Sequence, residues 1–173
     1  MRIDYLEDVP EFIPLLAREM AGHWRNIIPG ESYERRYEKL IAHKNRDQLP
    51  LAWVAHENGV PLGTSALRVC DLEGREDLFP WLAGIFVMPA CRGRGIAAKL
   101  CEVAEGKAWE WGIERLYLHT PDQQGLYRKL GWRSLELEDW NGVKTEVMIK
   151  DREASTTKVC RADSVSLKEP YGY

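Results

Sequence analysis

Apolar and polar positions divide the first part of the chain into a short strand and two helices. Residues 1–6 alternate weakly, which predicts a first strand, and apolar residues then recur at helical spacing over 8–24. Pro14 indicates that this helix starts late, with the proline in its first turn, or is kinked there. Ser32 can cap a second helix that continues over 33–41.

The middle of the chain predicts a hairpin, a buried strand and a long helix. Segments 51–56 and 60–69 flank Asn58-Gly59, a dipeptide that suits the positive φ angles of a type I′ turn, so we expect a β-hairpin. Residues 81–87 form a nearly continuous apolar run, which is typical of a central strand buried on both faces. After a glycine-rich loop, an apolar stripe over 96–111 predicts a helix.

The last elements of the pattern are a strand, a short helix and a second hairpin. The short strand covers 116–119, and the helix start after it is marked by a capping box, with Thr120 as N-cap and Gln123 as its partner. The stretch 132–150 predicts a hairpin that turns at Asn141-Gly142.

The order of these elements indicates an α/β protein with a mixed central β-sheet. We expect about seven strands, flanked on both faces by about four helices. A chain of 173 residues has the size of one domain. We therefore expect a single domain over 1–150, followed by a polar tail without firm structure over 151–173.

Composition excludes several classes of function. The 24 basic and 27 acidic side chains give a net charge of −3, without a basic stripe, so we expect no nucleic-acid partner. The longest charge-free stretch, 78–91, is too short to cross a bilayer, and the N-terminus lacks an apolar signal peptide, so we expect a cytoplasmic protein without membrane contact. The four cysteines and four histidines show no metal-ligand spacing, which predicts reduced thiols and no metal site.

The most informative stretch, 87–100, joins the buried strand to the long helix through a glycine-rich turn. The start of such a helix has free backbone N–H groups and the positive end of the helix dipole, and it can bind a phosphate. Arg92 and Arg94 add positive charge and donors at the same place. A purely structural turn, in which the glycines only permit packing, would explain the glycines equally well.

Two nucleotide-binding motifs fail to account for this turn. Gly93, Gly95 and Ala98 loosely fit the dinucleotide fingerprint, but the next strand does not end in the acidic residue that would bind a ribose. The Walker pattern lacks its second glycine, and Lys99 is not followed by Ser or Thr.

A third motif fits in full. Residues 92–97 (RGRGIA) match the acetyl-CoA motif Q/R-x-x-G-x-G/A of the GCN5-related N-acetyltransferase (GNAT) family, and residues 126–132 (LYRKLGW) resemble that family's second signature about thirty residues downstream. The chain resembles the family over nearly its whole length except the tail. The resemblance implies a GNAT-like fold and an acyltransferase with acetyl-CoA as cosubstrate.

The resemblance also implies which residues bind the cosubstrate. The buried strand would pair its backbone with the pantetheine arm, and a backbone N–H near Phe86 or Val87 would polarise the thioester carbonyl. The glycine-rich loop would bind the pyrophosphate, and Thr120, which stands where the family usually has Asn, could contact pantetheine, although capping alone explains it. The predicted cofactor-binding residues are Ile85, Phe86, Val87, Arg92, Gly93, Arg94, Gly95, Ile96, Ala97 and Thr120.

Two residues are catalytic candidates. The resemblance places Tyr127 beside the thioester sulfur, where a phenol with a pKa of ~10 can protonate the departing thiolate; the alternative is a tyrosine that only packs in the core. Many relatives carry a carboxylate on the buried strand as general base, but residues 82–84 hold none. His119 at the end of the next strand could relay the proton, or it packs there while water carries the proton.

Three functions remain open. The first is transfer of an acetyl group from acetyl-CoA to a primary amine of a small molecule, by direct attack in a ternary complex. The others are acetylation of a protein or peptide and a non-catalytic acyl-CoA-binding regulator. We also expect that a homodimer can form. Side chains that could line the acceptor cleft are Glu19, His23, Trp24, Tyr33, Tyr37 and Trp140.

Overall fold

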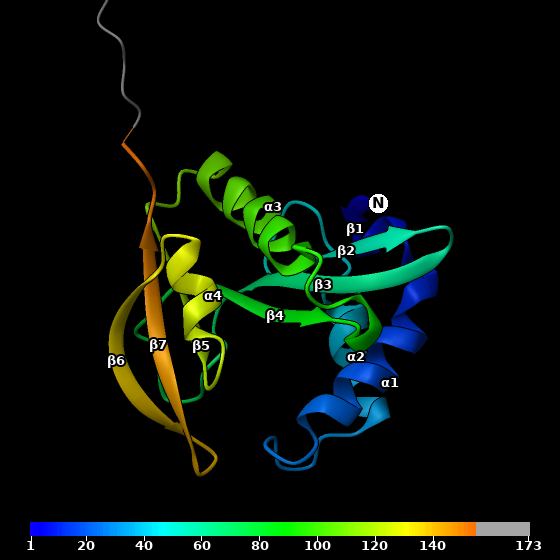
Figure 1. Ribbon diagram of the computed structural model, residues 1–173, viewed down its shortest axis with the longest axis horizontal. Coiled ribbons are helices and arrows are strands. Elements are labelled where there is room, and N and C mark those ends of the chain that lie inside the picture. Colours follow the sequence, from blue (N-terminus) through cyan, green and yellow to red (C-terminus); the bar gives the residue numbers. More distant parts are fainter. Residues whose placement is uncertain (155–173) are drawn as a thin grey trace, which may run out of the picture.

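The computed structural model describes residues 1–154 of the chain as a seven-stranded sheet flanked by helices (Figure 1). The strands follow one another across the sheet in the order β1-β2-β3-β4-β5-β7-β6. They are β1 (Arg2–Tyr5), β2 (Leu51–Glu57), β3 (Val60–Arg68), β4 (Trp81–Val87), β5 (Arg115–Thr120), β6 (Arg133–Trp140) and β7 (Val143–Asp151). The α-helices are α1 (Ile13–Trp24), α2 (Tyr33–Ala42), α3 (Ile96–Glu110) and α4 (Gln124–Lys129).

This architecture confirms the predicted α/β class with a mixed sheet, seven strands and four helices. The expected tail, 151–173, falls outside the described residues from 155 onward, and β7 itself reaches Asp151. Both Asn-Gly turns have the positive φ angles that were predicted. Pro14 lies in the first turn of α1, which two short 3-10 turns over 6–12 precede.

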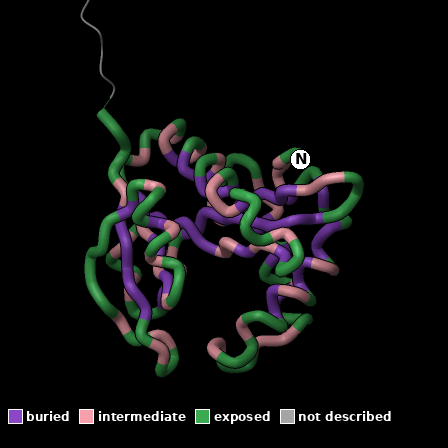
Figure 2. Tube along the Cα trace, in the orientation of Figure 1, coloured by how far each residue is buried: buried purple, intermediate pink, exposed green. Residues whose placement is uncertain are grey.

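The helices cover the two faces of the sheet with separate cores. Leu16 and Met20 of α1 pack with Phe86 on one face. Leu100 of α3 and Tyr127 of α4 belong to the core on the other face. Figure 2 shows the buried positions concentrated along the central strands between these layers. A central strand therefore buries both of its faces, as the apolar run over 81–87 predicts.

The pairing of β4 with β5 is the exception in the sheet. All other neighbouring strands are antiparallel, whereas β4 and β5 are parallel and aligned at one pair, Trp81 and Tyr117. Figure 1 shows the two strands running apart from there. Within residues 1–154, the second half of β4 therefore has a neighbouring strand on its β3 side alone.

A β-bulge bends β4 in this same half. Thr64 of β3 pairs with Phe86 and Ala66 pairs with Ala83, so Gly84 and Ile85 together stand opposite one residue of β3. Gly84 has a φ of 59°, a left-handed conformation that glycine adopts without steric cost. Bulges redirect the residues that follow them, so the backbone from Ile85 onward is turned relative to the first half of β4.

The predicted start of the fourth helix is wrong by three residues, since its N-cap is Gln123 and not Thr120. Thr120 remains in β5, where it pairs with Glu146, and α4 begins at Gln124. Thr120 Oγ1 accepts hydrogen bonds from the backbone N–H groups of Gln123 at 2.9 Å and Asp122 at 3.4 Å. The hydroxyl thus stabilises a turn between strand and helix, because pairing with β7 keeps Thr120 extended.

The close approach of β3 to β4 at Gly63 yields a stability prediction. A Cβ atom at Gly63 would lie 2.6 Å from the carbonyl oxygen of Phe86, so the two strands would have to separate. We expect Gly63→Ala to lower the free energy of unfolding by about 1–3 kcal/mol in urea denaturation, as overpacking does. Gly106→Ala in α3 is the matched control, since a Cβ there meets nothing within 4 Å and alanine favours a helix by roughly 0.5–1 kcal/mol. Equal stability of Gly63→Ala and the wild type would contradict the close approach.

Candidate active site

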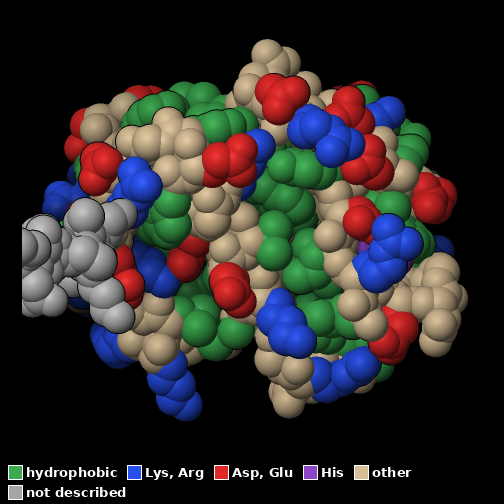
Figure 3. All heavy atoms as spheres, turned by 90° about the horizontal axis from the view of Figure 1, so that it is seen from above, with side chains coloured by type: hydrophobic (Ala, Val, Ile, Leu, Met, Phe, Trp, Pro, Cys, Tyr) green, Lys and Arg blue, Asp and Glu red, His purple; other side chains and the backbone are tan. Residues whose placement is uncertain are grey.

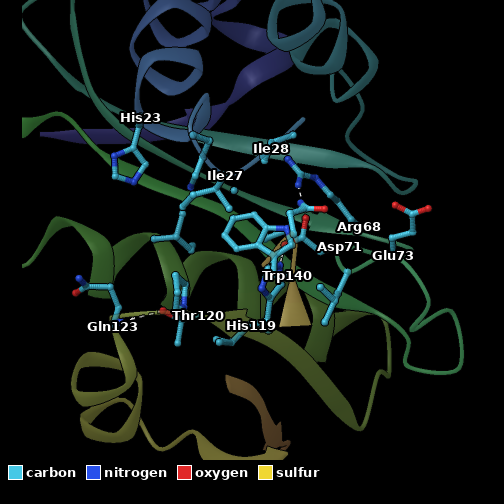
Figure 4. Close-up of a pocket in the computed structure, with 18 of the residues that line it drawn as sticks. His23, Ile27, Ile28, Arg68, Asp71, Glu73, His119, Thr120, Gln123 and Trp140 are labelled. Carbon is cyan, nitrogen blue, oxygen red and sulfur yellow. Dashed lines mark hydrogen bonds and ion pairs between the residues drawn. The ribbon is translucent and has the colours of Figure 1, made fainter. Parts of the chain in front are cut away.

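A cavity of about 730 Å³ opens where β4 and β5 part. Its walls come from both halves of the sheet and from the helices: α1 and the segment after it, α2, the segment after β3, β4, β5, α4 and the turn between β6 and β7. Figure 3 shows the molecule from the side of α3, with hydrophobic side chains gathered near the middle of the face and charged ones mostly around them. Figure 4 shows the side chains inside the cavity.

The glycine-rich turn lies at the end of β4. A 3-10 turn over Pro89–Cys91 leads into it, and Arg92 Nε donates a hydrogen bond to the carbonyl of Val87 at 3.2 Å. Gly95 is the N-cap of α3 with a φ of 73°, and no described side chain caps this helix. The first N–H groups of a 15-residue helix therefore remain available at this point. N–H groups at such a helix start can bind an anion, and here they lie directly beyond the free edge of β4.

The structure brings some of the predicted site residues together in the cavity. Ile85, His119, Thr120 and Tyr127 all line it. Phe86 is buried on the α1 face, where its ring lies 5.5 Å from that of His23. The other predicted residues do not line the cavity. They lie at the end of β4, in the loop that follows and in the first turn of α3: Val87, Arg92, Gly93, Arg94, Gly95, Ile96 and Ala97.

Tyr127 combines burial with access to the cavity. Its side chain is 6% exposed and packs edge-on against Trp132, with ring centroids 6.4 Å apart. Burial raises the pKa of Tyr127 well above that of a free phenol, and Cys101, Asp122 and Asp71 raise it further. The hydroxyl therefore carries its proton at any physiological pH and can act as a donor in the cavity.

His119 is held between two polar partners. Its Nδ1 lies 3.0 Å from Thr145 Oγ1 of β7, and its Nε2 lies 3.4 Å from Asp71 Oδ2. The rings of Trp81 and Trp140 pack edge-on against it, with centroid distances of 6.1 and 4.8 Å. These contacts fix the orientation of the imidazole on the wall of the cavity.

Asp71 is the functional candidate that the sequence pattern did not reveal. It follows β3 in an irregular segment, and no motif or spacing in the sequence marks it. Arg68 donates a hydrogen bond to Asp71 Oδ1. Burial alone would raise the pKa of Asp71, but Arg68 and His119 outweigh it and hold the pKa well below that of a free carboxyl. The cavity therefore contains an ionised carboxylate, although β4 has none.

A chain of hydrogen bonds continues from Asp71 to α2. Arg68 Nε donates to His43 Nε2 at 2.8 Å, and His43 Nδ1 lies 2.6 Å from the carbonyl of Lys39. Burial and the Arg68 charge lower the pKa of His43 to about 3, so this imidazole is neutral. Since its Nε2 accepts from Arg68, its Nδ1 carries the hydrogen and donates to Lys39.

The acceptor side of the cavity differs in part from the sequence prediction. His23, Trp24 and Trp140 line it as expected. Glu19, Tyr33 and Tyr37 are wrong as lining residues. The two tyrosines pack against each other on α2, and Glu19 lies beside Arg18 and does not line the cavity. The walls include further residues that the prediction missed: Ile27, Ile28, Lys39, Glu73 and Asp139.

The described residues contain neither a metal-binding cluster nor a membrane-spanning helix. Over residues 1–154, no three His, Cys, Asp or Glu side chains lie in a group that could hold a metal ion. The same part of the chain contains no helix with the length and apolar character needed to span a membrane.

Comparison with known proteins gives the family of this chain. The family model "Acetyltransferase (GNAT) family" matches residues 18–132. YjgM of Escherichia coli (strain K12), named as an uncharacterized N-acetyltransferase, is 32% identical over 88 residues. That match covers 49% of this chain and 52% of YjgM, so it spans about half the length of the relative.

Solved structures share the fold over almost the whole described chain. A ribosomal-protein-alanine N-acetyltransferase from Brucella melitensis has a TM-score of 0.68 at 20% identity, over 88% of this chain and all of that one. An aminoglycoside 6'-N-acetyltransferase complexed with coenzyme A has a TM-score of 0.65 at 16% identity, over 87% and 97%. The family model covers more than half of the sequence and the fold agrees with it, which confirms the resemblance: this chain belongs to the acetyltransferase (GNAT) family.

Proposed function

We propose that the chain is an acetyl-CoA-dependent N-acetyltransferase that acetylates a primary amine of a small molecule by direct attack in a ternary complex. The observation that carries this proposal is the position of Tyr127 on the wall of the cavity that the free edge of β4 borders. A thioester bound along that edge would meet both a backbone donor and a proton donor. Those are two of the groups that acyl transfer from sulfur to nitrogen requires.

The second half of β4 and the start of α3 suit the cosubstrate. The pantetheine arm contains amides that can pair with the β4 edge, as an added strand would. The pyrophosphate would then reach the N–H groups after Gly95, with Arg92 and Arg94 beside it. A similar fold solved with coenzyme A supports this assignment of the cosubstrate.

The chain then supplies groups that would assist the steps of the transfer. Acetyl-CoA supplies a thioester, which is an activated acyl donor. A backbone N–H near Phe86 or Val87 would donate to the carbonyl oxygen as negative charge develops on it. The amine forms the C–N bond while the C–S bond breaks, and the Tyr127 hydroxyl gives its proton to the departing sulfur.

The size of the cavity favours a small acceptor. Pockets for small molecules typically hold ~300–1,000 Å³, and this one holds about 730 Å³. The ring of Trp24 already packs against the Arg36 guanidinium, 4.9 Å from its centroid. Trp140 offers an aromatic ring to a cation, and Asp71, Glu73 and Asp139 offer negative charge. This combination supports an amine that enters as an ammonium ion.

The test of this function is release of free coenzyme A thiol from acetyl-CoA in the presence of a broad panel of primary amines. We expect thiol release that requires both an amine and the protein. We also expect Tyr127→Phe to lower kcat at least ten-fold with an unchanged Kd for acetyl-CoA, because the phenol acts after the cosubstrate has bound.

Two outcomes would contradict this proposal in different ways. Binding of acetyl-CoA without thiol release for any amine of the panel would favour a non-catalytic acyl-CoA-binding protein. An unchanged kcat in Tyr127→Phe would remove Tyr127 from the mechanism and leave the transferase activity in place.

The role of the glycine-rich turn in binding coenzyme A can be tested by substitutions at the two ends of α3. Gly95 and Gly112 flank α3 and have similar φ angles of 73° and 79°, and a Cβ atom at either meets nothing within 4 Å. Valine at either position is strained by roughly 1–2 kcal/mol. We expect Gly95→Val to raise the Kd for coenzyme A at least ten-fold in calorimetric titration, because the N–H groups of the first turn lose their alignment. Gly112→Val should bind coenzyme A like the wild type, and equal weakening in both variants would contradict the assignment.

A further inference from the structure

Asp71 and His119 form a pair of side chains in the acceptor half of the cavity. They lie far apart in the sequence, one after β3 and the other near the end of β5, yet 3.4 Å separates Asp71 Oδ2 from His119 Nε2. Figure 4 shows both residues together with Trp140 on one wall. The same cavity is lined by Ile85 and Tyr127, so the pair shares a space with the groups assigned to the thioester.

We propose that this pair receives the acceptor as an ammonium ion and removes its proton: Asp71 holds the ammonium group, and His119 Nε2 takes the proton. The inference rests on the proposed transferase function. It names the general base that β4 lacks, and it divides binding and deprotonation between two residues. It also defines the acceptor as an amine that is protonated when it enters the cavity.

A primary amine needs such a pair at neutral pH. Alkyl amines have a pKa of ~10, so nearly all of the acceptor in solution is ammonium, which has no lone pair for attack. A carboxylate in a partly enclosed cavity attracts this cation strongly. The proton must then move to a base before the C–N bond can form.

The surroundings of the two side chains suit different parts of this task. The Arg68 guanidinium lowers the pKa of Asp71, so this carboxylate stays charged and holds a cation but is a weak proton acceptor. Imidazole is the side chain whose ordinary pKa of ~6.5 allows it to take and release protons near neutrality. The two residues therefore act as anchor and base.

The contacts of His119 orient its base nitrogen. If Nδ1 carries the hydrogen and donates to Thr145 Oγ1 at 3.0 Å, the lone pair of Nε2 faces Asp71. An ammonium bound to Asp71 Oδ2 then lies beside that lone pair. Thr145 is fully buried and Arg68 is 8% exposed, so the two positioning residues are themselves fixed.

The proton transfers balance. The ammonium gives one proton to Nε2, and the electron pair of that N–H bond becomes the lone pair that attacks the thioester carbon. As the C–S bond breaks, sulfur takes the proton of Tyr127, and the phenolate regains one from the acylated nitrogen. The imidazolium releases its proton to solvent, so each acetyl transfer yields one amide, one thiol and one free proton.

Several charged groups surround the pair and contribute to its titration. Trp81 of β4, Trp140 of β6 and Thr145 of β7 pack against it without charge. The charged and titratable groups on the neighbouring elements are Lys39 and His43 of α2, Arg68 of β3, Glu73 after β3, Asp122 after β5 and Asp139 of β6.

The test compares the pH dependence of kcat/KM for the wild type, His119→Gln and Asp71→Asn. Glu76→Gln is the carboxylate control from the same segment, since Glu76 is exposed and does not line the cavity. We expect His119→Gln to lose at least ten-fold in kcat/KM at pH 7, with a deficit that shrinks as the pH approaches the pKa of the amine. There the acceptor already arrives as the free base, so a missing general base matters less. A purely structural defect would not be repaired in this way.

Asp71→Asn should give a different signature. The KM for the amine should rise at least ten-fold, because the ammonium loses its anchor. Glu76→Gln should keep the wild-type KM, because Glu76 lies outside the cavity lining.

A measurement on the wild type covers the case in which a variant does not fold. The ring of His119, followed by NMR, should titrate with the midpoint of the kinetic acidic limb. A wild type that releases no thiol with any amine would overturn the proposed function itself. An active wild type whose His119→Gln deficit is constant with pH, or whose His119 titration does not match the limb, would overturn the pair and leave the function intact.

Discussion

The parting of β4 from β5 is the constraint on which the rest of the structure depends. Parallel neighbours normally share an evenly spaced ladder of hydrogen bonds. Here one aligned pair, Trp81 and Tyr117, joins the strands, and beyond it β4 and β5 have no further paired residues. The peptide groups on the free edge of β4 must bond to water or to a ligand. The cavity and the accessible position of Tyr127 both follow from this geometry.

A sheet divided in this way needs other contacts across the gap, and polar networks supply them on both faces. On the α3 face, the buried Glu105 accepts hydrogen bonds from Trp132 Nε1 at 2.9 Å and from Lys150 Nζ at 2.6 Å. On the opposite face, Arg68, Asp71 and His119 connect β3 to β5. The second network thus connects the two halves of the sheet and places charged groups in the cavity.

The features of the fold that depend on neighbouring residues could be predicted from the sequence. The Asn-Gly turns, the buried run of β4 and the glycine-rich start of α3 each depend on residues within one element or one turn, so their spacing predicted them. Asp71 was missed because its role depends on how the segment after β3 folds back toward His119, 48 residues later in the chain. Thr120 was misplaced for a related reason, since pairing with β7 overrides its local preference for capping a helix.

Amide hydrogen exchange with and without saturating acetyl-CoA tests the central claim most directly, namely that the free edge of β4 and the start of α3 together bind the cosubstrate. We predict slower exchange in peptides that cover Ile85–Val87 and the first turn of α3, and unchanged exchange in β6. Unchanged exchange at both segments in the presence of bound acetyl-CoA, with protection elsewhere, would contradict this account.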